Sequence, residues 1–165
     1  MAVIQHEVKG PVTIVFNSKT LGFSRNGVTV RSDPCWENVP SDDFGGTGAP
    51  PSDAQLLGAI GRIVVDLTKY CKANVEELSK FLVPANAAIP TGKLPLIGSF
   101  VRQDGNAGVL ELIGRTKTRR FPTSFPRDAQ EFNEGTKYTS YMCSFEAWID
   151  DTNNRELFTE ITNAT

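Results

Sequence analysis

The chain has 165 residues and a mass of 18.0 kDa, which fits a single domain with one hydrophobic core. Its 39% hydrophobic content is above that of a disordered protein, and its formal net charge of -2 excludes a broad basic surface for nucleic acid or an anionic membrane. The 14 glycines and 10 prolines cluster between apolar runs, which favours many strands joined by turns.

The amino end, the lengths of the apolar runs and the cysteines further limit the class of protein that the sequence can encode. The amino end lacks the charged start and apolar run of a secretory signal, and no window holds the roughly 18 apolar residues of a membrane-spanning helix. We therefore expect a soluble protein made in the cytoplasm. Cys35, Cys71 and Cys143 are an odd number at wide spacing, which favours reduced, buried thiols. With His6 as the single histidine, we expect neither a zinc site nor any other cofactor.

In chain order, the first expected strands cover residues 12–16 and 20–24, with turn chemistry at residues 17–19. Asn26-Gly27 lies between the apolar runs 21–23 and 28–30. Because Asn and Gly tolerate the positive φ of a tight turn, this pair predicts a β-hairpin.

Residues 33–53 contain four prolines and four aspartates, so they predict a long loop. Trp36 and Phe44 give this loop apolar anchors. Two interpretations stay open: an arm that docks against a partner, or a surface loop packed on its own domain. The glycines at residues 45–48 are followed by Ala49-Pro50-Pro51 and by no lysine, which argues against a phosphate-binding loop.

Residues 57–67 alternate with period two, as a half-buried strand does. One face would hold the nonpolar set Leu57, Ala59, Gly61, Ile63, Val65 and Leu67. A short helix follows over residues 74–82, begun by a capping box of Asn74 and Glu77 and ended by Pro84. Its apolar face would lie on the sheet.

The second half predicts more strands. Residues 96–102 and 109–115 flank a turn and predict a second hairpin, which residues 116–121 would prolong. Residues 139–150 form the strongest core strand, since Tyr141, Cys143, Phe145, Ala147 and Ile149 share one face. Residues 155–162 predict a final strand that pairs back on it. The predicted fold is mainly β, an antiparallel β-sandwich with one short flanking α-helix, in a single domain covering residues 1–165.

One stretch concentrates positive charge. It holds five of the 17 basic residues, namely Arg115, Lys117, Arg119, Arg120 and Arg127. On a strand, Arg115, Lys117 and Arg119 would share a face. Three interpretations stay open: a solvated edge strand protected by charge, a contact with a neighbouring subunit, or contacts to phosphate.

No set of residues predicts catalysis. The chain has no Gly-x-Ser-x-Gly motif, and His6 lies in a terminal segment. The acidic pairs Asp42-Asp43 and Asp150-Asp151 sit beside turn signals, where solvated loop charges are expected rather than a paired-carboxylate site. We therefore do not expect an enzyme.

Three elements follow one another in the chain: the Gly/Pro loop at residues 45–51, the alternating strand through Leu67, and the helix 74–82 with Val75 and Leu78. Their order resembles that of the phage tail tube protein family, which includes the tubes of contractile injection systems. The resemblance implies a β-sandwich that assembles into hexameric rings, and rings that stack into a conduit for DNA. It also implies that an early hairpin or loop, here residues 19–31 or 33–53, reaches the next ring. DNA would pass without specific binding, so the basic run fits a subunit contact better than the lumen.

The expected function is therefore that of a virion structural protein, a tail tube subunit whose partners are copies of itself and other virion proteins. The candidate subunit contacts are Arg115, Lys117, Arg119, Arg120, Trp36 and Phe44. A neck, tail-terminator or capsid-decorating role is the alternative within this class. A monomeric module that binds glycan or peptide is the alternative from another class.

Overall fold

The computed structural model describes residues 10–39, 53–71, 73–75, 100–103, 107–127, 131–134, 139–149 and 156–163. These residues form one antiparallel sheet and a helical turn at residues 73–75, which confirms the predicted mainly β fold. The strands are β1 (Val12–Phe16), β2 (Lys19–Ser24), β3 (Val28–Val39), β4 (Asp53–Leu67), β5 (Lys69–Tyr70), β6 (Gly108–Ile113), β7 (Lys117–Pro126), β8 (Glu131–Glu134), β9 (Thr139–Trp148) and β10 (Thr159–Thr162).

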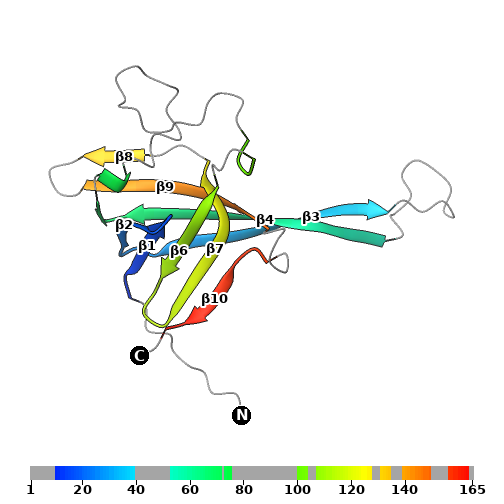
Figure 1. Cartoon of the computed structure of the whole chain (residues 1–165), viewed down its shortest axis with the longest axis horizontal. Helices are drawn as coiled ribbons and strands as arrows, with labels where there is room; N and C mark the ends of the chain where they lie inside the picture. Colours follow the sequence, from blue (N-terminus) through cyan, green and yellow to red (C-terminus); the bar gives the residue numbers. More distant parts are fainter. Residues whose placement is uncertain are drawn as a thin grey trace, which may run out of the picture.

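The sheet folds over on itself into two layers. Its strand order is β3-β4-β9-β7-β6-β1-β2-β5, with β10 also on β7 and β8 also on β9. Strand β7 joins the layers, because residues 117–120 pair with β10 and residues 123–126 pair with β9. The β4/β9 layer therefore lies across the β1/β6/β7 layer (Figure 1), and the rings of Phe16 and Phe145 meet between them at 5.3 Å.

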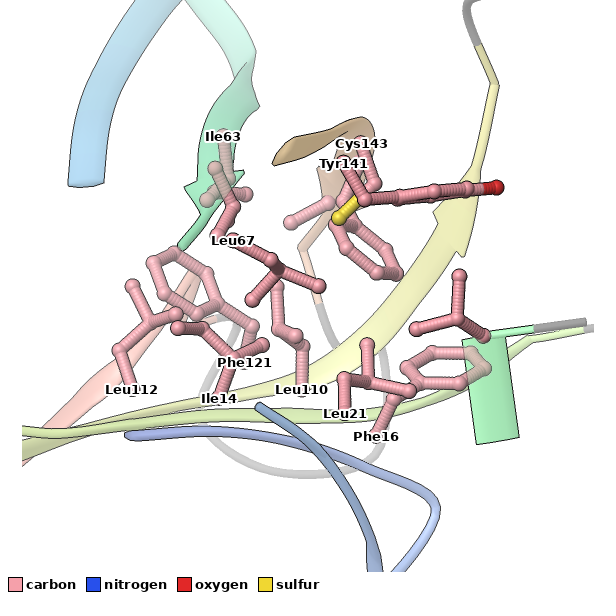
Figure 2. Packing of buried hydrophobic residues seen from close by; sticks show 14 residues of the cluster. Ile14, Phe16, Leu21, Ile63, Leu67, Leu110, Leu112, Phe121, Tyr141 and Cys143 are labelled. Carbon is pink, nitrogen blue, oxygen red and sulfur yellow. The ribbon is translucent and has the colours of Figure 1, made fainter. Parts of the chain in front are cut away.

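The core fills the space between the layers. Figure 2 shows Ile63, Leu67 and Cys143 on one side of it, with Ile14 and Leu110 on the other. The predicted period-two face of β9 is confirmed for Tyr141, Cys143, Phe145 and Ala147, whose side chains are all buried. Ile149, predicted on the same face, follows β9 and is only half-buried. In β4 the same prediction holds for Ile63, Val65 and Leu67 but fails at Leu57, which is 60% exposed.

Of the two turns predicted in the first thirty residues, the one at residues 17–19 is confirmed and the other is wrong. Asn17 and Ser18 have φ of 48° and 63°, so the tight turn with two positive φ values joins β1 to β2. The hairpin predicted at Asn26-Gly27 is wrong. Strand β2 pairs with β1 and β5 whereas β3 pairs with β4, so this turn carries the chain from one layer to the other.

The predicted loop over residues 33–53 is wrong for residues 33–39 and for Asp53, which lie in β3 and β4. Strand β9 pairs only with Ile60 to Leu67 of β4, so residues 34–39 and 53–59 pair with each other alone. We call residues 33–39 and 53–59 the arm, and Figure 1 shows it projecting from the sandwich. Pro34 is accommodated because β3 ends the strand order of the described sheet. Residues 40–52, with Phe44, lie outside the described residues.

Of the predicted helix 74–82, only residues 74 and 75 are described. Residue 73 is already helical, so Asn74 does not begin the helix. The Asn74 side chain instead donates a hydrogen bond to the Thr20 carbonyl at 2.6 Å, and Val75 is buried in the core. This turn therefore tethers the segment after β5 to β2.

Two predicted pairings in the second half are wrong. Residues 101–103 form a turn rather than the end of a strand, and residues 96–99 lie outside the described residues. The hairpin partner of β6 is β7, so residues 117–121 start a separate strand. The last strand, β10, pairs with β7 because β9 already has β4 along one edge and β7 and β8 along the other.

Phe121→Ala is expected to lower the free energy of unfolding by about 3–5 kcal/mol. Phe121 is fully buried, and its ring packs against that of Phe158 at 5.4 Å, so truncation leaves a cavity between β7 and the segment before β10. Urea denaturation would measure the loss. Phe23→Ala is the matched control, because Phe23 is 41% exposed, and an equal loss in both variants would contradict the described core.

Gly22→Ala is expected to destabilise the β2–β5 pairing. A Cβ atom at Gly22 would lie 2.1 Å from the Lys69 carbonyl oxygen, a backbone atom that cannot move away as a side chain can. Gly10→Ala is the control, since its nearest neighbour would be at 3.7 Å. Thermal unfolding should show a lower Tm for Gly22→Ala alone, and equal Tm values would show that β2 and β5 do not approach this closely.

Candidate subunit-contact surfaces

Part of the basic run is paired within the chain. Lys117 Nζ lies 2.7 Å from Glu160 Oε1, and Arg119 Nε lies 3.1 Å from Glu160 Oε2. Antiparallel pairing of β10 with β7 sets this geometry, because Glu160 is directly opposite Arg119. The prediction that Lys117 and Arg119 share a face is therefore confirmed. Hydrogen bonds from Lys117 and then from Arg119 hold the pKa of the Glu160 carboxyl below its usual value of 4.5.

The other members of the run are arranged differently. Arg115 precedes β7 instead of lying on a strand. Arg120 is on the opposite face of β7, where its Nε lies 3.6 Å from Glu111 Oε1 of β6. The edge-strand interpretation is wrong, since β7 has β6 along one side and β9 and β10 along the other. Arg127 is paired too, with its Nη1 2.5 Å from Oε1 of the buried Glu146.

Arg115, Lys117 and Arg119 nevertheless come together around a groove of about 400 Å³. A fourth cation, Arg25 of the turn between β2 and β3, lines the same groove. Sequence reasoning missed Arg25 because it is 90 residues away from Arg115 in the chain, and the approach of β3 to the β6–β7 turn is a tertiary feature.

The groove lies beside the β6–β7 turn and has an apolar part. Val12, Val28, Val30 and Leu112 contribute to its walls. Of these, Leu112 belongs to the core and the three valines pack partly against it. We call this site the basic groove, defined by its four cations Arg25, Arg115, Lys117 and Arg119.

The arm carries a second candidate surface. Trp36 is 58% exposed, and Leu56, which pairs with it across the arm, is 53% exposed. Leu57 and Val39 are exposed as well. Apolar side chains gathered on a projecting ribbon are typical of a protein contact. The structure thus places Trp36 on an exposed surface, whereas Phe44 lies outside the described residues.

The described residues offer little for redox or metal chemistry. Cys143 is buried. Burial, and to a smaller extent the negative charge of the nearby Asp66, raises the pKa of its thiol to about 12, so the thiol stays protonated. The prediction of buried thiols fails at Cys71, which is exposed, and at Cys35, which is only half-buried. Within the described ranges no three His, Cys, Asp or Glu side chains gather as metal ligands, and His6 lies outside them. None of the described helical residues forms a helix that could cross a membrane.

Glu160→Gln is expected to lower the urea midpoint slightly at pH 7 and by less at pH 3. The folded pKa of Glu160 is depressed, so its contribution is present above the unfolded pKa and is lost as pH falls through the folded pKa. High salt should shrink the effect, because the pairs are exposed. Glu156→Gln is the control, since Glu156 accepts a 3.3 Å hydrogen bond from Thr159 and makes no ion pair in the described part of the chain. An effect of Glu160→Gln that is equal at both pH values would contradict the pairing.

Comparison with known proteins identifies no family. No family model matches the chain, and no curated protein matches it. Among solved structures, a chain described as part of the virion of the native gene transfer agent (GTA) particle aligns over 93% of this chain and 95% of that chain, with a TM-score of 0.45 and 10% identity.

Proposed function

We propose that this chain is a virion structural protein, a tail tube subunit that works by head-to-tail association with copies of itself. The observation that carries the proposal is the arm, because its exposed Trp36, Leu56 and Leu57 project from a sandwich that already has a complete core of its own. Side chains of this kind need a partner to cover them.

The free edge of the sheet supports the same proposal. Strand β3 ends the strand order, so no other described strand lies along its outer edge. An edge of this length is a template for pairing with another chain, and closed assembly of copies removes such edges. The order of loop, strand and helix that resembles tail tube subunits agrees with this proposal.

In the proposed assembly, copies form a hexameric ring and the rings stack into a conduit through which DNA passes without specific binding. The protein would be made in the host cytoplasm and would act in the virion with other virion proteins. It needs no catalytic group or cofactor, since its work is done by shape and repetition. A neck, tail-terminator or decorating protein would use the same sandwich but would close or coat an assembly instead of extending it.

The basic groove favours one function of another class. A concave site of about 400 Å³ with apolar walls and four cations has the dimensions and the mixed lining of a ligand pocket. A monomeric binding module would use this groove and would leave the arm uncovered in solution.

Self-assembly can be tested with the purified chain. Negative-stain microscopy and sedimentation at rising protein concentration should show annuli or tubes with a pore. Trp36→Ala should raise the concentration needed for assembly by about tenfold or more, because buried tryptophans dominate contact energies. Its Tm should stay at the wild-type value, since Trp36 is outside the core.

Phe23→Ala is the matched control, because Phe23 is an exposed aromatic residue of the sandwich and not of the arm. A chain that stays monomeric at every concentration would contradict the tube proposal and favour the binding module. Binding to a preformed shell without tube growth would favour the decorating role.

A further inference from the structure

The basic groove is framed by two turns, and hydrogen bonds hold the first of them in place. This turn joins β2 to β3 and carries Arg25. Ser24 Oγ donates a 2.7 Å hydrogen bond to the Gly27 carbonyl and closes the turn. The Asn26 side chain then donates to the Asp66 carboxylate of β4 at 3.0 Å, which fixes the turn to the sheet.

The second turn joins β6 to β7, carries Arg115 and is held in the same way. The Gly114 amide donates to the Lys117 carbonyl at 2.9 Å. Asn163, which follows β10, donates from its side chain to the Gly114 carbonyl at 2.7 Å and from its backbone to the Thr116 carbonyl at 2.8 Å. Two turns with fixed backbones therefore present cations to one groove, and such preorganisation lowers the cost of binding.

The groove holds more positive than negative charge. None of the described residues that line it is acidic. Glu160 lies 2.7 Å from Lys117 and 3.1 Å from Arg119, so the charge of these two cations is partly neutralised. Arg25 and Arg115 are exposed and make no ion pair within the described part of the chain. They are therefore the groups that can receive an anion.

We propose that the basic groove binds a small amphipathic anion, a molecule with one phosphate, sulfonate or carboxylate group on an apolar body. Arg25 and Arg115 receive the anionic group, because guanidinium groups donate paired hydrogen bonds to such oxygens. The apolar body packs against Val12, Val28 and Val30, and the volume of about 400 Å³ suits a small molecule. This site goes beyond the proposed assembly and does not depend on it.

The residues of the groove favour this ligand over a nucleic acid or a bare anion. None of the described lining residues is aromatic, so nucleotide bases would have nothing to stack on. The cations gather at one concave site, whereas a nucleic acid backbone needs them along an extended track. A bare inorganic anion would leave the valines in contact with water. The ligand therefore needs both a charged group and an apolar body.

Phenyl phosphate tests the proposal, since it joins one phosphate to one apolar ring. Its binding to the full chain should be detected by ligand-observed NMR. Inorganic phosphate and phenol should each bind at least about tenfold more weakly, because each makes only part of the contacts. Arg25→Gln with Arg115→Gln should weaken the binding of phenyl phosphate at least about tenfold. Val28→Thr should weaken the binding of phenyl phosphate and leave that of inorganic phosphate unchanged, because it alters only the apolar wall.

Arg31→Gln with Arg120→Gln is the matched control, because it removes the same charge from exposed arginines that do not line the groove. It should bind phenyl phosphate like the wild type, and thermal unfolding should confirm that all variants fold. The proposal is overturned if phenyl phosphate does not bind, or if inorganic phosphate binds equally well. Unchanged binding in the Arg25 and Arg115 variant overturns it too, as does displacement of phenyl phosphate by a lower concentration of a single-stranded oligonucleotide.

The outcome is independent of self-assembly. Ligand-observed NMR detects binding to single chains and to assemblies alike, whereas microscopy of rings and tubes tests the proposed function. Binding without any assembly would support this site and contradict the tube. Assembly without binding would support the tube and contradict this site.

Discussion

The shared strand β7 is the constraint on which the structure depends. Its first half pairs with β10 and its second half with β9, while β6 follows the opposite edge. A strand that belongs to both layers brings the apolar faces of β4 and β9 over those of β1 and β6, and burial of these faces drives folding. Leu110 and Phe121, directly paired and fully buried, lie where this fold-over closes the core.

The same constraint determines which surfaces remain for partners. Strand β9 pairs with only the last eight residues of β4, so the first part of β4 extends beyond the sandwich with β3. The arm exists because the β3–β4 hairpin is longer than β9, the strand that pairs with β4. At the other end of β3, the chain crosses between layers at Asn26-Gly27 and leaves the basic groove beside the β6–β7 turn. The arm is thus exposed to other chains, while the groove is a separate concave site.

Some features could be read directly from the residues. Strict alternation identified β9 and the inner half of β4, because a strand with one buried face must repeat with period two. The charges of Lys117 and Arg119 were rightly placed on one face for the same reason. The loop predicted at residues 33–53 failed at its first seven positions, because Pro34 and nearby polar residues look like a break in structure. An edge strand tolerates a proline when its outer side has no partner.

The sequence by itself determined the mainly β class, the main core strands, the concentration of basic residues before and along β7, and the turn chemistry at residues 17–19. Each of these depends on neighbours within a few positions, through side-chain alternation or local backbone preference. Only the tertiary structure decided that Asn26-Gly27 crosses between layers, that β10 pairs with β7, and that Arg25 joins Arg115 at one groove. Strand partners are chosen by which edges are still open and which faces can be buried together, and these depend on contacts between residues far apart in the chain.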